Sequence, residues 1–221
     1  MQVKFWGESA LFCRPEYKAE PHTYPALTPT AAEGMLKAIF WKPEIRYEIE
    51  RIVALNPVRT MAMVRNTVQD KATPSTVRQW ARKGGHYFAD SDRAQRNHVL
   101  LKDPAYIVHF HLELAPHADG NADKYVAQLK RRIGRGQCFR QPYFGCREYP
   151  AFFGWPQGDE TVHPELLGER DLGMMPKKLH FIPSEDGPIS WRDAATRQTV
   201  SGRMEPEFFR ARMHDGAIEV N

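Results

Sequence analysis

Residues 106–114 read YIVHFHLEL, and their character alternates more clearly than that of any other stretch of the chain. Every second residue from Tyr106 to Leu114 is apolar, and the histidines His109 and His111 lie between them. A period of two places successive side chains on opposite faces of a strand, so one face is apolar here. We therefore predict a half-buried strand over 106–114, and we infer the rest of the fold outward from it.

Upstream of this strand, the sequence predicts two more strands with a helix between them. Residues 2–6 and 45–49 alternate in the same way, and apolar residues between them recur at helical spacing. Thr30 and Glu33 match a capping box, in which each side chain satisfies a free amide at the helix start. We expect the helix to end just before Pro43, because proline disfavours helix for the residue that precedes it.

Downstream, the sequence predicts a second helix and a fourth strand. Helical spacing runs from about Asn121 to Ile133, a loop with glycines follows, and the aromatic segment 149–155 is typical of a short strand. The resulting order, β-α-β-β-α-β, is that of ferredoxin-like and RNA-recognition-type units. We therefore predict the α+β class, with a ferredoxin-like (RRM-like) domain.

Two parts of the chain fall outside this unit. Residues 56–100 are polar and basic in places, which predicts an inserted hairpin or arm outside the core. From about residue 156 onward the chain is loop-rich. Candidate short strands in this part are 178–182, 188–192 and 208–213. We predict a ferredoxin-like domain over 1–155 and a small β-rich C-terminal domain over 156–221.

Composition limits the possible functions only loosely. The 221 residues carry a net charge of +4, which permits a polyanionic partner without requiring one. The three cysteines, Cys13, Cys138 and Cys146, form no CxxC pair, so we expect free thiols rather than a zinc ribbon. We find no signal-peptide pattern and no apolar run of about 18 residues. We expect a soluble cytoplasmic protein with no membrane partner.

The second predicted helix carries a narrow polar stripe rich in cations. At about 100° per residue, Lys124, Gln128, Arg131 and Arg135 fall together, nearly opposite an apolar arc. We call these four residues the cationic stripe. A solvated helix face is the simplest explanation of such a stripe. Its continuation into a loop with more arginines favours a site for a phosphodiester backbone instead.

The loop after this helix combines glycines with arginines, which predicts an anion site. Gly134 and Gly136 are expected to free backbone amides, and guanidinium groups surround them. A dinucleotide fingerprint requires its glycines before a helix, whereas these follow one, where the helix dipole is negative. We therefore predict that the anion is a nucleic-acid backbone. The residues predicted to contact it are Lys42, Gln128, Arg131, Arg132, Gly134, Arg135, Gly136, Arg140 and Arg147.

Two groups of side chains have the chemistry of metal ligands. His109 and His111 share a strand face, and Asp90 and Asp92, near His98, offer carboxylate oxygens of the kind that Mg²⁺ prefers. Both groups are more often part of an ordinary polar surface than of a metal site. We therefore predict no metal site.

Three segments together resemble a known family. AIFWKPEIRYEI (38–49), QRNHVLLKDPAYIV (95–108) and the run FGCREY (144–149) resemble the CRISPR-associated Cas-five family, subtype I-C, also called Dvulg. The resemblance covers roughly residues 2–155. It implies a ferredoxin-like RAMP domain and an endoribonuclease that cuts CRISPR precursor RNA within its repeat. It also implies that the enzyme keeps the 5′ handle of the mature crRNA and joins other subunits of a type I-C Cascade-like complex.

The resemblance further implies a cut that needs no metal, in which a 2′-hydroxyl attacks the neighbouring phosphate and leaves a cyclic phosphate. The family's catalytic tyrosine corresponds to Phe40 here, and its Lys-His pair corresponds to Asp123 and Lys124. The hydroxyl and the imidazole are therefore both missing. The catalytic candidates that remain are Lys124 as charge stabiliser or acid, Tyr125 with an outward hydroxyl, and His117 as base.

These departures leave two alternatives open. The chain can be a non-catalytic subunit that binds the crRNA handle, because two catalytic positions are changed. It can also be a nuclease that uses a divalent metal to cut double-stranded DNA, through the aspartates or histidines above. Product ends separate the first alternative from RNA cleavage, and sensitivity to a chelator separates the second.

Overall fold

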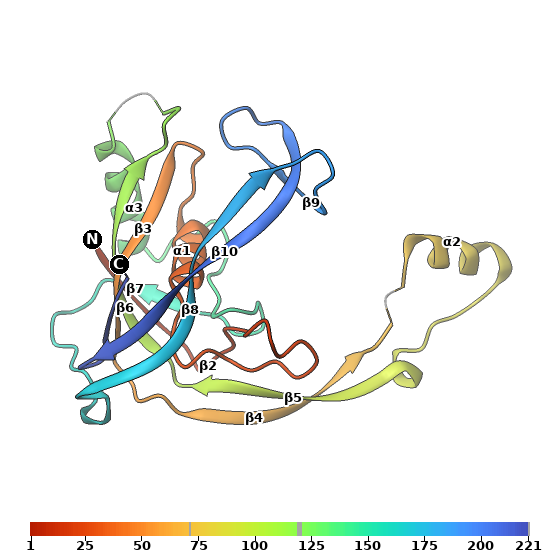
Figure 1. Cartoon of the computed structure of the whole chain (residues 1–221), viewed down its shortest axis with the longest axis horizontal. Coiled ribbons are helices and arrows are strands. Elements are labelled where there is room, and N and C mark those ends of the chain that lie inside the picture. Colours follow the sequence, from red (N-terminus) through yellow and green to blue (C-terminus); the bar gives the residue numbers. More distant parts are fainter. Residues whose placement is uncertain (71, 119–120, 221) are drawn as a thin grey trace.

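The computed structural model describes residues 1–70, 72–118 and 121–220 (Figure 1). Its elements, in chain order, are β1 (Gln2–Trp6), β2 (Ser9–Ala10), α1 (Pro29–Ile39), β3 (Ile45–Ala54), β4 (Thr60–Val68), α2 (Pro74–Lys83), η1 (Ala89–Asp92), β5 (Arg93–Lys102), β6 (Ala105–Leu114), α3 (Asp123–Gly134), β7 (Phe152–Gly154), η2 (Pro164–Leu166), β8 (Glu169–Pro183), β9 (Ile189–Arg192), β10 (Thr199–His214) and β11 (Ala217–Glu219). The chain is thus mixed α and β, as predicted.

The central sheet is built around β6, the strand predicted at 106–114. The order β7-β1-β6-β3 is antiparallel throughout, and β6 lies between β1 and β3. Along the chain, α1 lies between β1 and β3, and α3 lies between β6 and β7. Val108 and Phe110 of β6 are fully buried, as the alternation predicts. Burying each such side chain contributes about 1.5–3 kcal/mol.

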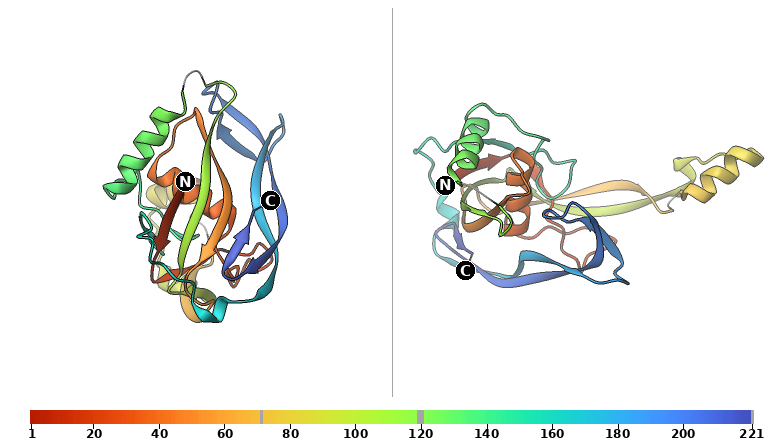
Figure 2. Two further views of the ribbon diagram at one scale, coloured as in Figure 1. Left: turned by 90° about the vertical axis from the view of Figure 1, so that its left-hand side faces the viewer. Right: turned by 90° about the horizontal axis from the view of Figure 1, so that it is seen from above.

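The C-terminal strands continue this sheet. β11 pairs with β3 and with β10, and β10 pairs with β8, so one sheet runs from β7 to β8. The sheet curves until β8 contacts α1 (Figure 2). β8 and β10 are longer than the strands predicted at 178–182 and 208–213. Gly173, Pro176 and Pro206 lie inside them and weaken the strand signal in the sequence.

Helix α1 begins two residues earlier than predicted. Its N-cap is Thr28, whose hydroxyl oxygen accepts a hydrogen bond from the Ala31 amide at 3.2 Å, and Pro29 occupies the first helical position. The capping box predicted at Thr30 and Glu33 is therefore wrong. Glu33 instead forms an ion pair with Lys37, one turn further along the helix.

The C-terminal end of α1 is held by three other parts of the chain. The amides of Phe139 and Arg140 donate to the Ala38 carbonyl oxygen. The Arg132 guanidinium donates to the Ile39 carbonyl oxygen at 2.8 Å, and the Tyr47 hydroxyl donates to the Phe40 carbonyl oxygen at 2.7 Å. These donors satisfy carbonyl groups that a helix end leaves free. They also fix the loop after α3 against α1.

β4 and β5 pair as a hairpin that projects from the molecule, with α2 at its far end (Figure 1). α2 has no buried residue, which agrees with the predicted arm. The base of the hairpin is different, because Leu100 and Leu101 are buried in the core and β5 pairs with β2. The polar composition of the whole segment hides this anchor.

Candidate nucleic-acid interface

Three loops meet at one end of the central sheet. Trp41, Lys42 and Pro43, which connect α1 to β3, line one side of a cavity of about 360 Å³. The turn between β9 and β10 lines the other side through Arg192, Asp193, Ala194 and Arg197. The connection between β6 and α3 begins at the same place, because the Ala115 amide donates to the Glu44 carbonyl oxygen at 2.8 Å. We call this region the three-loop end; it lies at the top of Figure 1.

Cations dominate the three-loop end. Its acidic group, Asp193, is occupied by its own turn, because one carboxylate oxygen accepts from the Thr196 amide at 2.7 Å and the Thr196 hydroxyl at 2.8 Å. These hydrogen bonds are the main reason that its pKa is lowered. Among the described residues, Lys42, Arg192 and Arg197 form no ion pair. The cavity therefore presents three cations against one carboxylate, a net positive charge, beside the exposed Trp41 ring.

The three catalytic candidates occupy different environments. Lys124 is exposed on the first turn of α3, and its Nζ lies 4.6 Å from the centre of the Tyr125 ring. Tyr125 is only 8% exposed and belongs to the hydrophobic core. His117 is exposed in the loop that leads to α3. Lys124 and His117 can therefore reach a bound molecule, whereas the Tyr125 ring supports the lysine from below.

Phe40, the position to which the resemblance assigns a catalytic tyrosine, is buried. Phe40 is 1% exposed, and its ring packs against the Arg132 guanidinium, whose central carbon lies 5.4 Å from the ring centre. Tyr47 brings a hydroxyl to the same place, but it donates to the Phe40 carbonyl oxygen, and burial raises its pKa. Tyr47 therefore completes the fold rather than supplying a reactive hydroxyl.

The cationic stripe keeps two exposed arginines. Arg131 and Arg135 are exposed and, within the described ranges, have no acidic partner, while Gln128 is half-buried. Arg132, between the two arginines, turns to α1 as described above. The stripe thus presents cations at the C-terminal end of α3, next to the loop that carries Arg140.

The glycine loop does not work as predicted. The amides of Arg135, Gly136 and Gln137 donate to carbonyl oxygens in the last turn of α3. Gly136 has a φ of +62°, which closes this turn, and Gly134 lies against Trp155. These amides serve the helix end and are not free for an anion. Any attraction for phosphate must come from the guanidinium groups.

Arg140 and Arg147 extend the positive surface beyond α3. Both are exposed, and among the described residues neither forms an ion pair. The residue after Arg147 is Glu148, which pairs with Arg65 of the hairpin and has a lowered pKa for that reason. The local acid is therefore neutralised, and Arg147 remains available.

The two groups of potential metal ligands are engaged elsewhere. His111 contacts Glu113 and Glu50, which raise its pKa. Asp92 accepts from the Asp70 amide and the Tyr87 hydroxyl, while His98 is buried, with its pKa lowered by burial. Within 1–70, 72–118 and 121–220, no three histidine, cysteine or acidic side chains gather in a metal-binding arrangement. The same ranges contain no helix long and apolar enough to cross a membrane.

Sequence reasoning did not identify Trp41, Arg192 and Arg197. The two arginines lie about 150 positions from Trp41, in a part of the chain assigned to another domain. The one local signal in the sequence was a tryptophan next to Lys42 and Pro43. In the structure the ring of this tryptophan is half exposed. An exposed aromatic side chain next to cations is a common feature of single-stranded nucleic-acid sites.

Comparison with known proteins identifies the class of protein to which this fold and surface belong. The family model described as CRISPR-associated protein (Cas_Cas5) matches residues 1–221. The chain therefore belongs to the Cas5 family of CRISPR-associated proteins. The matching family model and two curated relatives carry the name Cas5d, which places the chain in subtype I-C.

Two of these relatives match over the whole chain. A Thermus thermophilus protein named CRISPR pre-crRNA endoribonuclease Cas5d is 40% identical over 220 residues, which cover 100% of this chain and 90% of the relative. A protein of the same name from Mannheimia succiniciproducens is 35% identical over 230 residues, covering 100% and 94%.

Solved structures support the fold. A CRISPR-associated protein matches with a TM-score of 0.62 at 19% identity, covering 100% of this chain and 90% of that one. A functionally uncharacterized protein from Streptococcus mutans matches with a TM-score of 0.64 at 18% identity, covering 100% and 91%.

Proposed function

We propose that the chain is an endoribonuclease that cleaves CRISPR precursor RNA within its repeat. The observation that carries this proposal is full-length similarity, at 40% and 35% identity, to two proteins named as pre-crRNA endoribonucleases. The exposed cations of the three-loop end and of α3 supply the charge that such a substrate requires. Because the substrate is a transcript, we place the activity in the cytoplasm, where the three free cysteines stay reduced.

The proposed reaction needs no metal. A 2′-hydroxyl loses its proton to a base, and its oxygen attacks the adjacent phosphorus. The bond from phosphorus to the 5′-oxygen breaks, and that oxygen takes a proton from an acid. The products are a 2′,3′-cyclic phosphate and a 5′-hydroxyl. The protein must supply a base, an acid and a cation near the charged phosphate oxygens.

His117 and Lys124 are the side chains to which we assign this chemistry. His117 lies in the connection that follows β6, Lys124 lies on the first turn of α3, and both are exposed. A neutral His117 imidazole can accept the 2′-hydroxyl proton, and the Lys124 ammonium can donate a proton or stabilise the phosphate charge. Tyr125 supports Lys124 through its ring, and the proposal does not depend on its hydroxyl.

We further propose that the enzyme keeps the 5′ handle of its product and joins a type I-C Cascade-like complex through it. Lys42, Arg131, Arg135, Arg140 and Arg147 form the surface along which we place the RNA backbone. These cations do not take part in the chemical step, so they remain available to the product after the cut.

One observation favours a second candidate function. Phe40 is buried where the family carries a catalytic tyrosine, and Tyr47 uses its hydroxyl on a backbone carbonyl. If no other group replaces that hydroxyl, the chain binds the repeat and the handle without cutting. Binding and cleavage must therefore be measured separately.

The test compares His117→Ala, Lys124→Ala and the control Lys130→Ala on a labelled cognate repeat hairpin. Lys130 is exposed on the same helix, about 120° away from Lys124. We expect the first two variants to bind normally and to cut at least about 100-fold more slowly, as loss of an acid or base predicts. The control should cut normally.

Two results would contradict the assignment. If both variants cut at the wild-type rate, these residues are not catalytic. If the wild type binds the hairpin and leaves it whole, the chain is a handle-binding subunit. Cleavage of double-stranded DNA that appears only with Mg²⁺ or Mn²⁺ would instead support the metal-dependent nuclease.

A further inference from the structure

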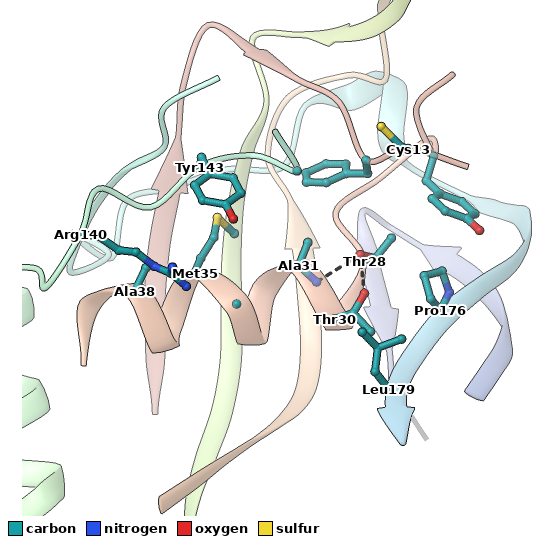
Figure 3. Close-up of a pocket in the computed structure, with 14 residues that line it drawn as sticks. Cys13, Thr28, Thr30, Ala31, Met35, Ala38, Arg140, Tyr143, Pro176 and Leu179 are labelled. Atoms are coloured by element: carbon teal, nitrogen blue, oxygen red, sulfur yellow. Dashed lines mark hydrogen bonds between the residues drawn. The ribbon is translucent and has the colours of Figure 1, made fainter. Parts of the chain in front are cut away.

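A groove runs along the exposed face of α1, between the loop that follows α3 and strand β8 (Figure 3). Its volume is about 380 Å³, within the range of small-ligand sites. Met35, Ala31 and Gly34 form its floor on α1, Tyr143 covers one side, and Pro176 and Leu179 of β8 close the other. We call this the α1 groove; its lining is predominantly apolar.

Two polar groups at one end of the α1 groove have no partner. Arg140 and Tyr143 lie beside Met35 and Ala38, and the Tyr143 hydroxyl points toward the helix (Figure 3). Within the described part of the chain, neither the guanidinium nor this hydroxyl makes a hydrogen bond or ion pair through its side chain. An apolar slot with a few convergent polar groups is typical of a binding site.

Gly34 leaves open space on the α1 side of the groove. Glycine inside a helix costs about 1 kcal/mol relative to alanine. A Cβ at this position would meet nothing within 4 Å, and no left-handed φ is involved. The fold therefore does not require glycine here, and the missing side chain leaves more of the groove open.

We propose that the α1 groove binds one unstacked base of the bound RNA, with the adjoining phosphate on Arg140. This inference rests on the proposed function, and it adds a site for a single base to the backbone contacts described above. Sequence-specific RNA recognition uses splayed bases that stack on aromatic rings and receive hydrogen bonds at their edges. The Tyr143 ring and hydroxyl provide both kinds of contact. The groove lies beside Arg140, which belongs to the surface assigned to the RNA backbone, so a strand on that surface can turn one base into it.

The test fills the groove without disturbing the core. Gly34→Phe places a ring in the open space and also removes the helix cost of glycine, so its melting temperature should not fall. Gly34→Ala is the matched control, because a methyl group leaves most of the groove empty. Binding is measured with the cognate repeat RNA and with a series in which each unpaired nucleotide in turn lacks its base.

The wild type and Gly34→Ala should lose about tenfold in affinity when one particular base is absent, as expected for a single stacked base. Gly34→Phe should bind the intact RNA about tenfold more weakly and should be indifferent to that base. If Gly34→Phe binds the intact RNA as tightly as the wild type, or still discriminates every missing base, the groove does not hold a base. If the wild type does not bind repeat RNA at all, the proposed function itself fails, and the inference fails with it.

Discussion

Neighbouring arginines on α3 have different tasks. Arg131 points to solvent, whereas Arg132 donates to the Ile39 carbonyl oxygen and covers the Phe40 ring. Helical spacing of 100° per residue shows that the two side chains point in different directions. It does not show that the end of α1 lies beside Arg132. Arg132 was predicted to contact RNA, and part of its hydrogen-bonding capacity is instead used to hold α1.

We therefore expect Arg132→Ala to lower the free energy of unfolding by about 1.5–3 kcal/mol, the usual range for a hydrogen bond to a charged group. Arg131→Ala is the matched control and should change it by less than about 0.5 kcal/mol, because its side chain is on the surface. Chemical denaturation of both variants measures the difference. Equal stabilities would show that the contact with Ile39 contributes nothing.

The reactivity of one cysteine, Cys13, should depend on pH. The sulfur atoms of Cys13 and Cys146 lie 3.9 Å apart. A hydrogen bond from the Cys146 thiol favours the Cys13 thiolate and lowers the pKa of Cys13 to about 7, against partial burial, which raises it. The thiolate is the form that reacts with an alkylating agent.

Alkylation of Cys13 by iodoacetamide should accelerate as the pH rises through about 7. In Cys146→Ala the hydrogen bond is lost, so the midpoint should move up toward the ordinary value of a thiol, about 8.5. Mass spectrometry of the Cys13 peptide at a series of pH values measures both midpoints. An unchanged midpoint in the variant would exclude Cys146 as the cause.

At the scale of elements, the regular parts were predictable because their signals are local. The alternation in β1, β3 and β6 and the helical spacing in α1 and α3 each identify an element without knowledge of the rest of the chain. The role of the glycines was not predictable in this way. Gly136 was assigned to an anion site, but it closes α3, and Gly145 is required because a Cβ there would lie 1.9 Å from the Leu11 carbonyl oxygen.

These two glycines allow a direct comparison, because both have a positive φ. Gly136→Ala should cost about 1–2 kcal/mol, the cost of the left-handed conformation alone, since nothing lies within 4 Å of the added methyl group. Gly145→Ala adds a clash with backbone and should cost more than about 4 kcal/mol. Thermal unfolding compares them; similar losses would contradict the close approach of Leu11 to Gly145.

At the scale of the whole molecule, the sequence did not reveal how distant segments meet. The pairing of β11 with β3 joins 217–219 to 51–53 through a strand of three residues, which has no pattern of its own. That pairing makes the C-terminal strands part of the central sheet. It also supports the curved β10–β8 ribbon, whose neighbouring β9–β10 turn brings Arg192 and Arg197 to Lys42 and forms the three-loop end. The catalytic candidates stay predictions: the family resemblance points to Lys124 and Tyr125, and His117 is the nearest imidazole upstream of them.

The distribution of charge predicts how RNA affinity depends on salt. Several phosphates neutralised by arginine and lysine release counterions, so the logarithm of the affinity should fall linearly with the logarithm of the salt concentration. Removing Arg131 and Arg135 together should weaken binding to every RNA and reduce the slope by about 1.4 for a single strand. Fluorescence anisotropy at four salt concentrations measures the slope. Unchanged affinity in the double variant would contradict a role for the cationic stripe.

The most direct test of the central claim is the structure of the product ends made by the wild-type chain in EDTA. A repeat hairpin labelled at its 5′ end is incubated with the protein, and the fragments are analysed by mass spectrometry. The account predicts one cut, with a 2′,3′-cyclic phosphate on the upstream fragment and a 5′-hydroxyl on the downstream one. RNA that is bound but intact, or a cut that needs added metal and leaves other ends, would contradict it.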